Sequence, residues 1–565
     1  MKRLNLFLII FITFIFRASF LGAALAPETQ SPSRCLGCHS NLTGKNFIHL
    51  QRHQKSVHGH LSCTVCHSSD RVASIDPLHR ESVHSNAVPS VPAAPPDPLS
   101  RKSRFPEALE ACGRCHEEIY AQVRQSVHGR AIFEKKNPDA AFCSDCHTPI
   151  HYIRPVSEVS SSVARANLID TCSRCHANRV IASRYHLNVF VVQSYKAHFH
   201  GKKYSLGGKD TPTCIYCHGH HTIRNVKDPA AWVSSRNKIT LCARCHDGAT
   251  AEFAESFTHT PLNAGSNPAA IWVRKGLLSI LMVFAIFLGL HLLLDIAQQF
   301  RSIGKKKHTA LTRGEVSWPL FQRLPKEVER MDLHLRIQHA LLFVAVFYLA
   351  ASGIALKFPE MHFSEAWIRL WGGVENAGHL HRFAALILII DLFYHLLYLG
   401  VQGFRKKLSL KLIPDIQDFS HLYQNLRYLI GKSREKPRFG TFTYIQKLDY
   451  WLVIFVVIVM IITGLMYWFP TITARILPAG VSKWIWGVAY VVHSTEAILI
   501  LFFAFVWHFY NVHLKSRVFP MSWVWITGKI DLEDLMEEHP GEFEELFAAE
   551  RNKEAESSKG ENRSE

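Results

Sequence analysis

Long apolar runs lie almost entirely in the second half of the 565-residue chain. Five of them are long enough for a helix to cross a bilayer, which takes about 20 residues. The stretch before them, roughly 31–268, has few long periodic apolar segments, so short helices and loops are expected there. The membrane spans are predicted at about 271–297, 334–356, 380–401, 450–468 and 488–512.

Basic residues are distributed unevenly among the connections between these runs. The connections after the first and third runs are rich in Lys and Arg, whereas the other two carry only Lys357 with Arg369, and Arg475 with Lys483. Because basic loops are retained on the cytoplasmic side, this pattern places the segment before the first run in the periplasm of a bacterial inner membrane and the C-terminus in the cytoplasm. The basic loops also explain the formal net charge of +18, and we expect no nucleic-acid partner.

The N-terminus has the pattern of an export signal. Lys2 and Arg3 precede an apolar run, Leu4–Phe16, and small residues follow at 22–26. Residues 1–26 are therefore predicted to be a signal peptide or an uncleaved anchor, and either one would export the segment that follows.

All 14 cysteines belong to Cys-x-x-Cys-His motifs. Two thiols at this spacing can each bond a vinyl-derived carbon of one porphyrin, and the adjacent histidine can then ligate the iron. The pattern predicts seven covalent c-type haems. Zinc ribbons are the alternative, because they also use paired Cys-x-x-Cys, but a zinc site does not need a histidine directly after the second cysteine.

The haem-binding residues follow from these motifs. The thioether cysteines are predicted to be Cys35, Cys38, Cys63, Cys66, Cys112, Cys115, Cys143, Cys146, Cys172, Cys175, Cys214, Cys217, Cys242 and Cys245. The proximal iron ligands are predicted to be His39, His67, His116, His147, His176, His218 and His246. A second repeated element, Ser-Val-His, supplies His58, His84 and His128, which we expect to ligate three of the irons from the other side.

Composition divides the chain into domains. We predict a two-haem lobe at 31–85, a Pro-rich linker at 86–106, a five-haem lobe at 107–268, a transmembrane cytochrome b domain at 269–513 and a cytoplasmic tail at 514–565. The stretch from about Asp531 to Glu565 is acidic and has little periodicity after Phe547, so we expect a partly disordered tail. The predicted fold class is all-α, with short helices and loops around haems followed by a five-helix transmembrane bundle that has a di-haem four-helix core.

The last four apolar runs contain an internal repeat. Ser352-Gly353 is followed six residues later by Pro359, and Thr463-Gly464 is followed at the same distance by Pro470. The second and third runs and the fourth and fifth runs are therefore two related helical hairpins.

Each copy of the repeat is followed by two histidines, His381 and His395 in one copy and His493 and His508 in the other. About four helical turns separate the members of each pair, so both lie on one helix face roughly 21 Å apart. Two such helices predict two non-covalent b haems, an outer one held by His381 and His493 and an inner one held by His395 and His508. Alternatively, the histidines could be buried and bonded to nearby carbonyls, which explains one residue more easily than four.

Other histidines and two carboxylates add candidates in the membrane. His339 could replace His395 as the inner ligand or line a quinone pocket, and His291 is a weaker candidate. Glu496 and Asp391 lie within a turn of predicted ligands and could accept protons from a quinol. The alternative role for each carboxylate is a hydrogen bond that orients a haem ligand.

These membrane residues resemble the di-haem cytochrome b subunits of the formate dehydrogenase and nickel–iron hydrogenase type. The resemblance covers about Met331 to Pro540 and rests on Arg336-x-x-His339, both copies of the repeat, His381, His493 and His508-Phe-Tyr. In those subunits the inner haem is held from the first bundle helix, which implies His339 here. The fusion to a multihaem c segment is similar to the CbcL-type inner-membrane cytochromes of metal-reducing bacteria, which implies menaquinol oxidation coupled to periplasmic electron export.

The sequence therefore predicts a quinol:cytochrome c-type oxidoreductase. Electrons would pass from the membrane quinone pool through two b haems and seven c haems to a periplasmic redox protein, such as another multihaem cytochrome c. Two alternatives stay open: a periplasmic reductase of a small nitrogen or sulfur oxyanion, and a non-catalytic subunit that relays electrons from a dehydrogenase.

Overall fold

The computed structural model describes residues 36, 40–41, 47–61, 63–66, 106–260, 267–302, 324–515 and 518–561. Apart from one two-stranded sheet, the regular elements in this part of the chain are helices, which confirms the predicted all-α class. The chain divides into two compact units, Met1–Thr171 and Cys172–Glu565. This division falls inside the predicted five-haem lobe, and the domain boundaries inferred from composition stay predictions.

The first unit contains short helices joined by turns. Residues 47–61 pack on residues 150–154, where the Val57 amide donates to the Ile153 carbonyl at 2.9 Å and the His49 amide donates to the Tyr152 hydroxyl at 2.9 Å. Its elements are α3 (Leu50–Gln54), α4 (Cys63–Cys66), α8 (Pro106–Gly113), α9 (Glu117–Gln125), α10 (Val127–Phe133), α11 (Cys143–Cys146), η2 (Ile150–Tyr152) and η3 (Arg165–Asn167).

The second unit begins with a segment of short helices that carries three Cys-x-x-Cys-His motifs, and parts of this segment pack against the bundle. Leu206, directly after α15, is buried in a core with Ala355 and Ile368. The Asn267 side-chain amide donates to the Trp484 carbonyl at 2.8 Å. The elements are α12 (Leu168–His176), which crosses the unit boundary, α13 (Arg179–Arg184), α14 (Val191–Ala197), α15 (Phe199–Ser205), α16 (Cys214–His218), α17 (Lys238–Ala243) and α18 (Ala251–Ser256).

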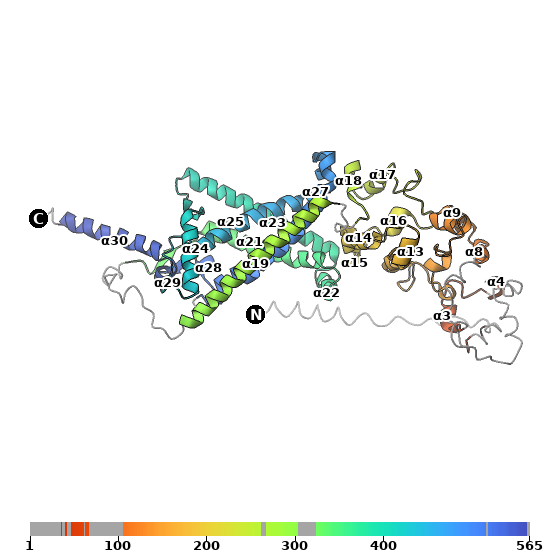
Figure 1. Cartoon of the computed structure of the whole chain (residues 1–565), viewed down its shortest axis with the longest axis horizontal. Helices are drawn as coiled ribbons and strands as arrows, with labels where there is room; N and C mark the ends of the chain where they lie inside the picture. The colour runs from red at the N-terminus through yellow and green to blue at the C-terminus, as the bar shows by residue number, and fades with distance from the viewer. Residues whose placement is uncertain are drawn as a thin grey trace, which may run out of the picture. The chain divides into compact units, whose positions relative to one another are not determined.

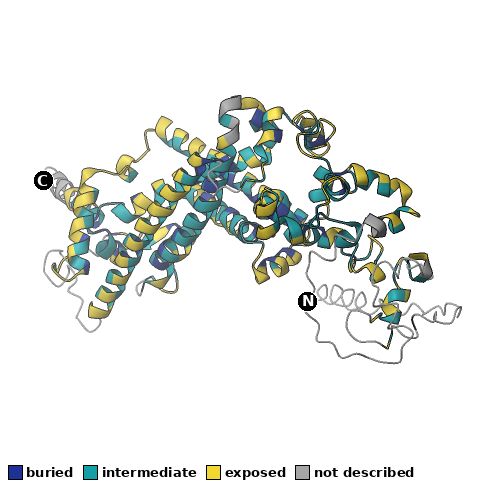
Figure 2. Ribbon diagram, turned by 45° about the vertical axis from the view of Figure 1, so that its right-hand side comes forward, coloured by how far each residue is buried: buried dark blue, intermediate teal, exposed yellow. Residues whose placement is uncertain are grey.

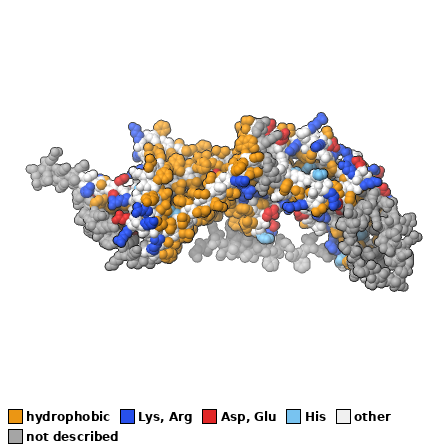
Figure 3. Space-filling view, in the orientation of Figure 1, with side chains coloured by type: hydrophobic (Ala, Val, Ile, Leu, Met, Phe, Trp, Pro, Cys, Tyr) orange, Lys and Arg blue, Asp and Glu red, His pale blue; other side chains and the backbone are white. Residues whose placement is uncertain are grey.

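Five helices of the second unit are long and apolar enough to cross a membrane, as predicted (Figure 1). Their outward faces are exposed and apolar, with Phe343, Leu397 and Phe455 each more than half exposed (Figures 2 and 3). Such a surface is stable only when covered by an apolar medium, so the chain is an integral membrane protein. The helices are α19 (Pro268–Ser302), α21 (Leu333–Lys357), α23 (Val374–Phe404), α25 (Tyr444–Trp468) and α27 (Ala479–Phe502), which η7 (Phe503–His508) and η8 (Tyr510–Leu514) extend as π-helix.

The internal repeat of the sequence is a structural repeat. Helices α21 and α25 both end at the Phe-Pro step, where Phe358 and Phe469 have φ near −120° and ψ near 61°. A residue before proline is disfavoured in the helical region, so the same dipeptide stops both helices at the same point. A short helix follows each break, α22 (His362–Leu370) and α26 (Pro470–Ile476). We call this end of the bundle, together with α14–α18, the motif end.

The opposite end of the bundle carries a folded cap, which we call the basic end (residues 324–332, 405–443 and 515–561). The strand β1 (Glu327–Glu329) pairs antiparallel with β2 (Lys529–Asp531). Behind this sheet, Leu324, Leu532, Leu535 and Phe543 form a buried core. The other elements are η6 (Leu410–Leu412), α24 (Ile416–Leu429), α28 (Val524–Thr527), α29 (Leu532–Glu538) and α30 (Pro540–Glu561).

Residues 529–547, at the start of the predicted tail, are therefore folded, and the expectation of partial disorder in the tail as a whole stays a prediction. Its apolar side chains are too few to form a core alone, but Leu324 and Val328 from before α21 complete it. Arg330 fixes the cap further by bonding to Glu542 and to the Thr441 carbonyl.

Replacing Leu535 with alanine should loosen this cap. Leu535 is fully buried, and a Leu-to-Ala change at such a position costs about 2–5 kcal/mol. Hydrogen exchange in residues 529–547 should accelerate, whereas Ile526→Ala, at a position 44% exposed, should leave it unchanged. Equal effects from the two variants would contradict the described core.

Candidate functional site

Two histidines at the motif end of the bundle core are held in the same way. The Ser352 hydroxyl donates to the Tyr348 carbonyl at 2.6 Å and lies 2.8 Å from His381 Nδ1. In the second hairpin, Thr463 donates to the Val459 carbonyl at 2.8 Å and lies 2.9 Å from His493 Nδ1. Because each hydroxyl proton is already committed to a carbonyl, its oxygen accepts from the imidazole Nδ1–H. Nε2 of both rings therefore has a free lone pair, and an imidazole in this tautomer can bind iron through Nε2.

The glycines of the repeat make room for these rings. A Cβ atom at Gly353 would lie 3.5 Å from His381 Cε1, and one at Gly464 would lie 3.4 Å from His493 Cε1. A Cβ atom would already be in van der Waals contact with the imidazole, so a bulky branched side chain at either position would compete with the ring for space. The His493 ring is near enough to influence His381 electrostatically, so the two predicted ligands lie in the same part of the bundle core.

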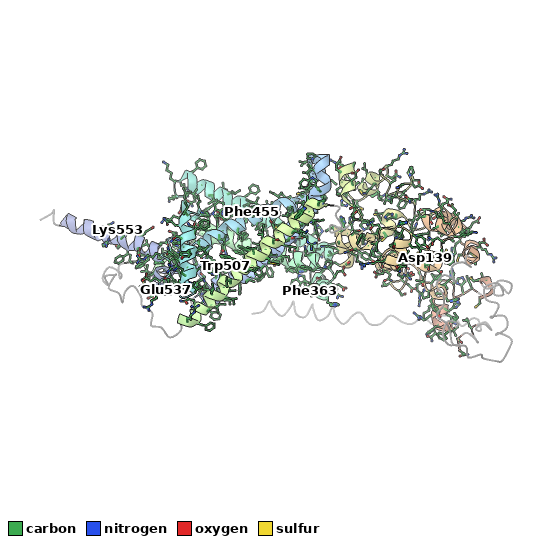
Figure 4. The ribbon with its side chains drawn as sticks, viewed as in Figure 1. Asp139, Phe363, Phe455, Trp507, Glu537 and Lys553 are labelled. Carbon is green, nitrogen blue, oxygen red and sulfur yellow. The ribbon has the colours of Figure 1, made fainter. Side chains whose placement is uncertain are left out.

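A second pair of histidines lies nearer the basic end, and it consists of His339 and His508. Their ring centres are 6.4 Å apart. Nδ1 of His339 is buried and has no hydrogen-bond partner, while Nδ1 of His508 lies 3.8 Å from an Asp449 carboxylate oxygen. The Trp507 indole, labelled in Figure 4, donates to the other carboxylate oxygen of Asp449 at 3.0 Å.

His395 does not share this arrangement. Its Nδ1 lies 2.8 Å from Gln338 Oε1 and its Nε2 lies 2.8 Å from the Tyr450 hydroxyl, so both ring nitrogens have protein partners. The sequence preference for His395 as the inner ligand is therefore not supported by the geometry, which favours His339. The spacing argument also assumed a regular α-helix between His493 and His508, whereas His508 lies in the π-helical segment η7.

Both candidate carboxylates are buried in the bundle. Asp391 is 7% exposed and Glu496 is 6% exposed. One oxygen of each, Oδ1 of Asp391 and Oε2 of Glu496, has no hydrogen-bond partner. A buried carboxylate with an unused acceptor can take up a proton, so the geometry is compatible with the predicted role.

Most of the Cys-x-x-Cys-His motifs lie on or beside short helices. The described residues include both cysteines of the second motif and the complete third to seventh motifs, and no disulfide joins these cysteines. The remaining predicted residues, Cys35, Cys38, His39, His67 and His84, lie outside the described part of the chain. His128 lies on α10, and its assignment as a distal ligand stays a prediction.

Three motif histidines face a second histidine at a similar distance. Ring centres are 6.2 Å apart for His58 and His116, 6.2 Å for His200 and His246, and 6.1 Å for His218 and His259. An imidazole nitrogen binds a metal at about 2.0–2.1 Å, so two rings on opposite sides of one iron have centres roughly 6.3 Å apart. The structure thus places His58 opposite the third motif, and it brings His200 and His259 to positions that the sequence did not single out.

A His-Gly dipeptide is the sequence signal that could have found His200. A Cβ at Gly59, Gly129 or Gly201 would come within 2.4 Å of a backbone carbonyl of the preceding turn. Glycine is therefore required where the histidine-bearing turn crosses the preceding segment. The element that recurs is His-Gly, and the Ser-Val part of the motif is not needed.

Two of the buried imidazoles, His200 and His218, favour the neutral form. Burial lowers the pKa of His200 and of His218 to about 4. Neutral imidazole is the form that ligates a metal.

Cysteines of consecutive motifs are neighbours. Thiols of Cys112 and Cys143 interact directly, as do those of Cys172 and Cys214. Burial raises the pKa of the Cys217 thiol to about 11, with a smaller contribution from Cys242. Groups attached to neighbouring motifs would therefore be close together. Among the described residues, no three His, Cys, Asp or Glu side chains are arranged to hold a single metal ion, as a zinc ribbon would require.

Comparisons with known proteins match the bundle. Residues 330–520 match the family model described as prokaryotic cytochrome b561. The cytochrome b556 subunit of nitrate-inducible formate dehydrogenase from Escherichia coli K12 is 24% identical over 232 residues, which is 41% of this chain and 97% of the relative. The corresponding Shigella flexneri protein gives the same values. The membrane half therefore resembles a membrane-bound, electron-transferring cytochrome b, a class that holds haem b.

Enlarging either glycine beside an outer histidine should remove one non-covalent haem. The side chain in Gly464→Leu would displace the His493 ring, and Gly353→Leu would displace that of His381. We expect acid–acetone extraction to release about half the wild-type amount of haem b. In the matched control Gly400→Leu the added Cβ meets nothing within 4 Å, so haem content should be unchanged. Full haem b content in both test variants would exclude the assigned outer pair.

Proposed function

We propose that this protein is a quinol:cytochrome c-type oxidoreductase of the bacterial inner membrane. It passes electrons from the quinone pool through two b haems and seven c haems to a periplasmic acceptor. The observation that carries the proposal is the set of paired histidines, His339 with His508 in the bundle and three pairs among the Cys-x-x-Cys-His motifs of the described residues. His381 and His493 add to it, because Ser352 and Thr463 hold them in the same way.

The bundle residues fit two b haems. His381 and His493 would hold the outer group through Nε2, because Ser352 and Thr463 fix their Nδ1 protons. His339 and His508 would hold the inner group, with the Asp449 carboxylate orienting His508.

The motif residues fit thioether-linked haems. Each pair of cysteines would anchor one porphyrin, and His58, His200 and His259 would be distal ligands of the third, seventh and sixth haems. When bound, these groups supply one-electron transfer, and the chain sets their potentials through ligands and burial. The contacts between cysteines of consecutive motifs would keep neighbouring haems close enough for electrons to pass from one to the next.

Quinol oxidation also releases protons, and the buried carboxylates are suited to accept them. Glu496 lies one turn after His493 and would serve a site beside the outer pair. Asp391 lies one turn before His395, whose bond to the Tyr450 hydroxyl gives a polar lining for a quinol headgroup near the inner pair. His395 would then line the quinone site, the role first considered for His339.

Location and partners follow from the charge pattern. The basic end would face the cytoplasm and the motif end the periplasm, where a second multihaem cytochrome c could receive the electrons. The E. coli relative is named as a subunit of formate dehydrogenase. This favours, as a second candidate, a subunit that relays electrons for a separate dehydrogenase.

Anaerobic addition of a menaquinol analogue to the purified chain tests the proposed function. The separate b and c absorption bands should both be reduced, the b band first, and mass spectrometry should find seven covalent haems. A chain that carries both haem types but is not reduced by quinol would be the relay subunit instead. Absence of either haem type would contradict both candidates.

The inner ligand can be identified by comparing two alanine variants. His339→Ala should lose one of the two b haems, because it removes an iron ligand. His395→Ala should keep both and oxidise quinol more slowly, because only the bonds to Gln338 and Tyr450 disappear. Pyridine haemochrome spectra and quinol turnover measure the two effects. The opposite result would restore His395 as the ligand.

Replacing Glu496 with glutamine should slow quinol oxidation without changing the haem spectra. The amide keeps the shape of the side chain but cannot accept the proton, and a positioned base typically contributes about 10²–10⁴-fold. Asp391→Asn tests the inner side in the same way. Stopped-flow reduction at the b band gives the rates, and a variant with wild-type turnover would lose its assigned role.

A further inference from the structure

Two lysines from distant segments meet at the motif end of the bundle. Lys202, on α15, donates from Nζ to the Tyr490 hydroxyl at 2.7 Å and to the Lys357 carbonyl at 3.4 Å. Lys357, the last residue of α21, donates to the Ser494 hydroxyl at 2.8 Å. Both ammonium groups lie by the Tyr490 ring, at 5.1 Å and 5.6 Å from its centre.

Among the described residues, these two charges have no carboxylate partner. Neither lysine forms an ion pair with a carboxylate of the described residues, whereas the adjacent Lys203 lies 3.4 Å from Glu375. Two partly buried positive charges beside one ring repel each other unless an anion lies between them. An ammonium group has three donors, so Lys202 keeps one N–H and Lys357 keeps two for a further acceptor.

The position of the lysines indicates which anion they bind. Ser494 directly follows His493, and Tyr490 precedes His493 by about one helical turn. Lys202 lies two residues after His200, which faces His246 of the seventh motif. The lysine pair therefore lies beside the edge of the outer haem site and connects it to the segment that holds a c-type site.

We propose that Lys202 and Lys357 bind a propionate carboxylate of the outer b haem. The inference rests on the proposed function, since it requires haem b at His381 and His493. It assigns a residue of the Cys-x-x-Cys-His segment to the b-haem site, so the membrane haem is held jointly by both parts of the second unit. A charge-assisted bond from each lysine satisfies the carboxylate, and the carboxylate removes the repulsion between the lysines.

A phosphate of an anionic lipid headgroup offers the same chemistry at this depth, and the experiment separates the two sources. We compare Lys202→Met and Lys357→Met with the control Lys203→Met, whose lysine is already paired with Glu375. Anaerobic redox titration at the b band gives the midpoint potentials of both b haems, and native mass spectrometry counts bound phospholipid.

Propionate binding predicts a lower midpoint potential for one b haem in both test variants, since removing a nearby positive charge favours ferric iron. The other b haem should keep its wild-type potential in both test variants, and the Lys203→Met control should keep both potentials. Lys357→Arg retains the positive charge, so its midpoint potentials should stay close to those of the wild type. The c-band spectrum reports folding in every variant, and a well-folded variant that loses only the outer b haem also supports the proposal.

Two results would overturn the inference. Unchanged potentials with fewer bound phospholipids would assign the site to a lipid, and unchanged potentials with unchanged lipid would leave the lysines without an anionic ligand. If the wild-type protein contains two b haems and oxidises quinol, either of these results leaves the proposed function intact. A wild type without haem b would instead contradict that function.

Discussion

The hydrogen bonds from His381 to Ser352 and from His493 to Thr463 are the constraint on which the bundle site depends. An imidazole in an apolar bundle can rotate toward several hydrogen-bond partners, and the partner that it bonds decides which of its two ring nitrogens remains available. Each hydroxyl donates a hydrogen bond to the helix backbone, so its oxygen accepts the hydrogen bond from Nδ1–H and only Nε2 remains for a ligand. The glycine that follows each hydroxyl residue then leaves room for the ring beside the helix. Two adjacent residues thus set both the chemistry and the position of each histidine.

The second unit joins this bundle to the Cys-x-x-Cys-His segment through several kinds of contact. Leu206 adds an apolar side chain to the hairpin core, and Asn267 bonds to the backbone of Trp484. Lys202 bridges to Lys357 and Tyr490. These contacts hold residues 172–246 at one end of the bundle, so the last three motifs belong to the same compact body as the membrane helices.

The sequence was sufficient for the features set by composition and spacing. Five apolar runs gave five helices, and the Ser/Thr-Gly…Phe-Pro repeat gave two hairpins that end at the same step. It was insufficient where a partner comes from a distant segment. His395 has the expected spacing, but Gln338 and Tyr450 from two other helices occupy its nitrogens. Leu324 similarly completes a core whose other members lie about 200 residues later, a partner that the C-terminal sequence alone does not reveal.

The π-helical turn at Phe503–His508 distinguishes the second hairpin from the first, in which the corresponding helix α23 is a regular α-helix. His493 and His508 are one residue further apart than His381 and His395, and a widened turn is how a helix absorbs a single inserted residue without losing its register beyond it. In the proposed haem assignment, the helix with the extra residue supplies both of its histidines, His493 and His508. The other hairpin would supply His381 from one helix and His339 from the neighbouring one, which leaves His395 for the proposed quinone site. One added residue in a helix would thus be enough to make two related hairpins contribute differently to the same site.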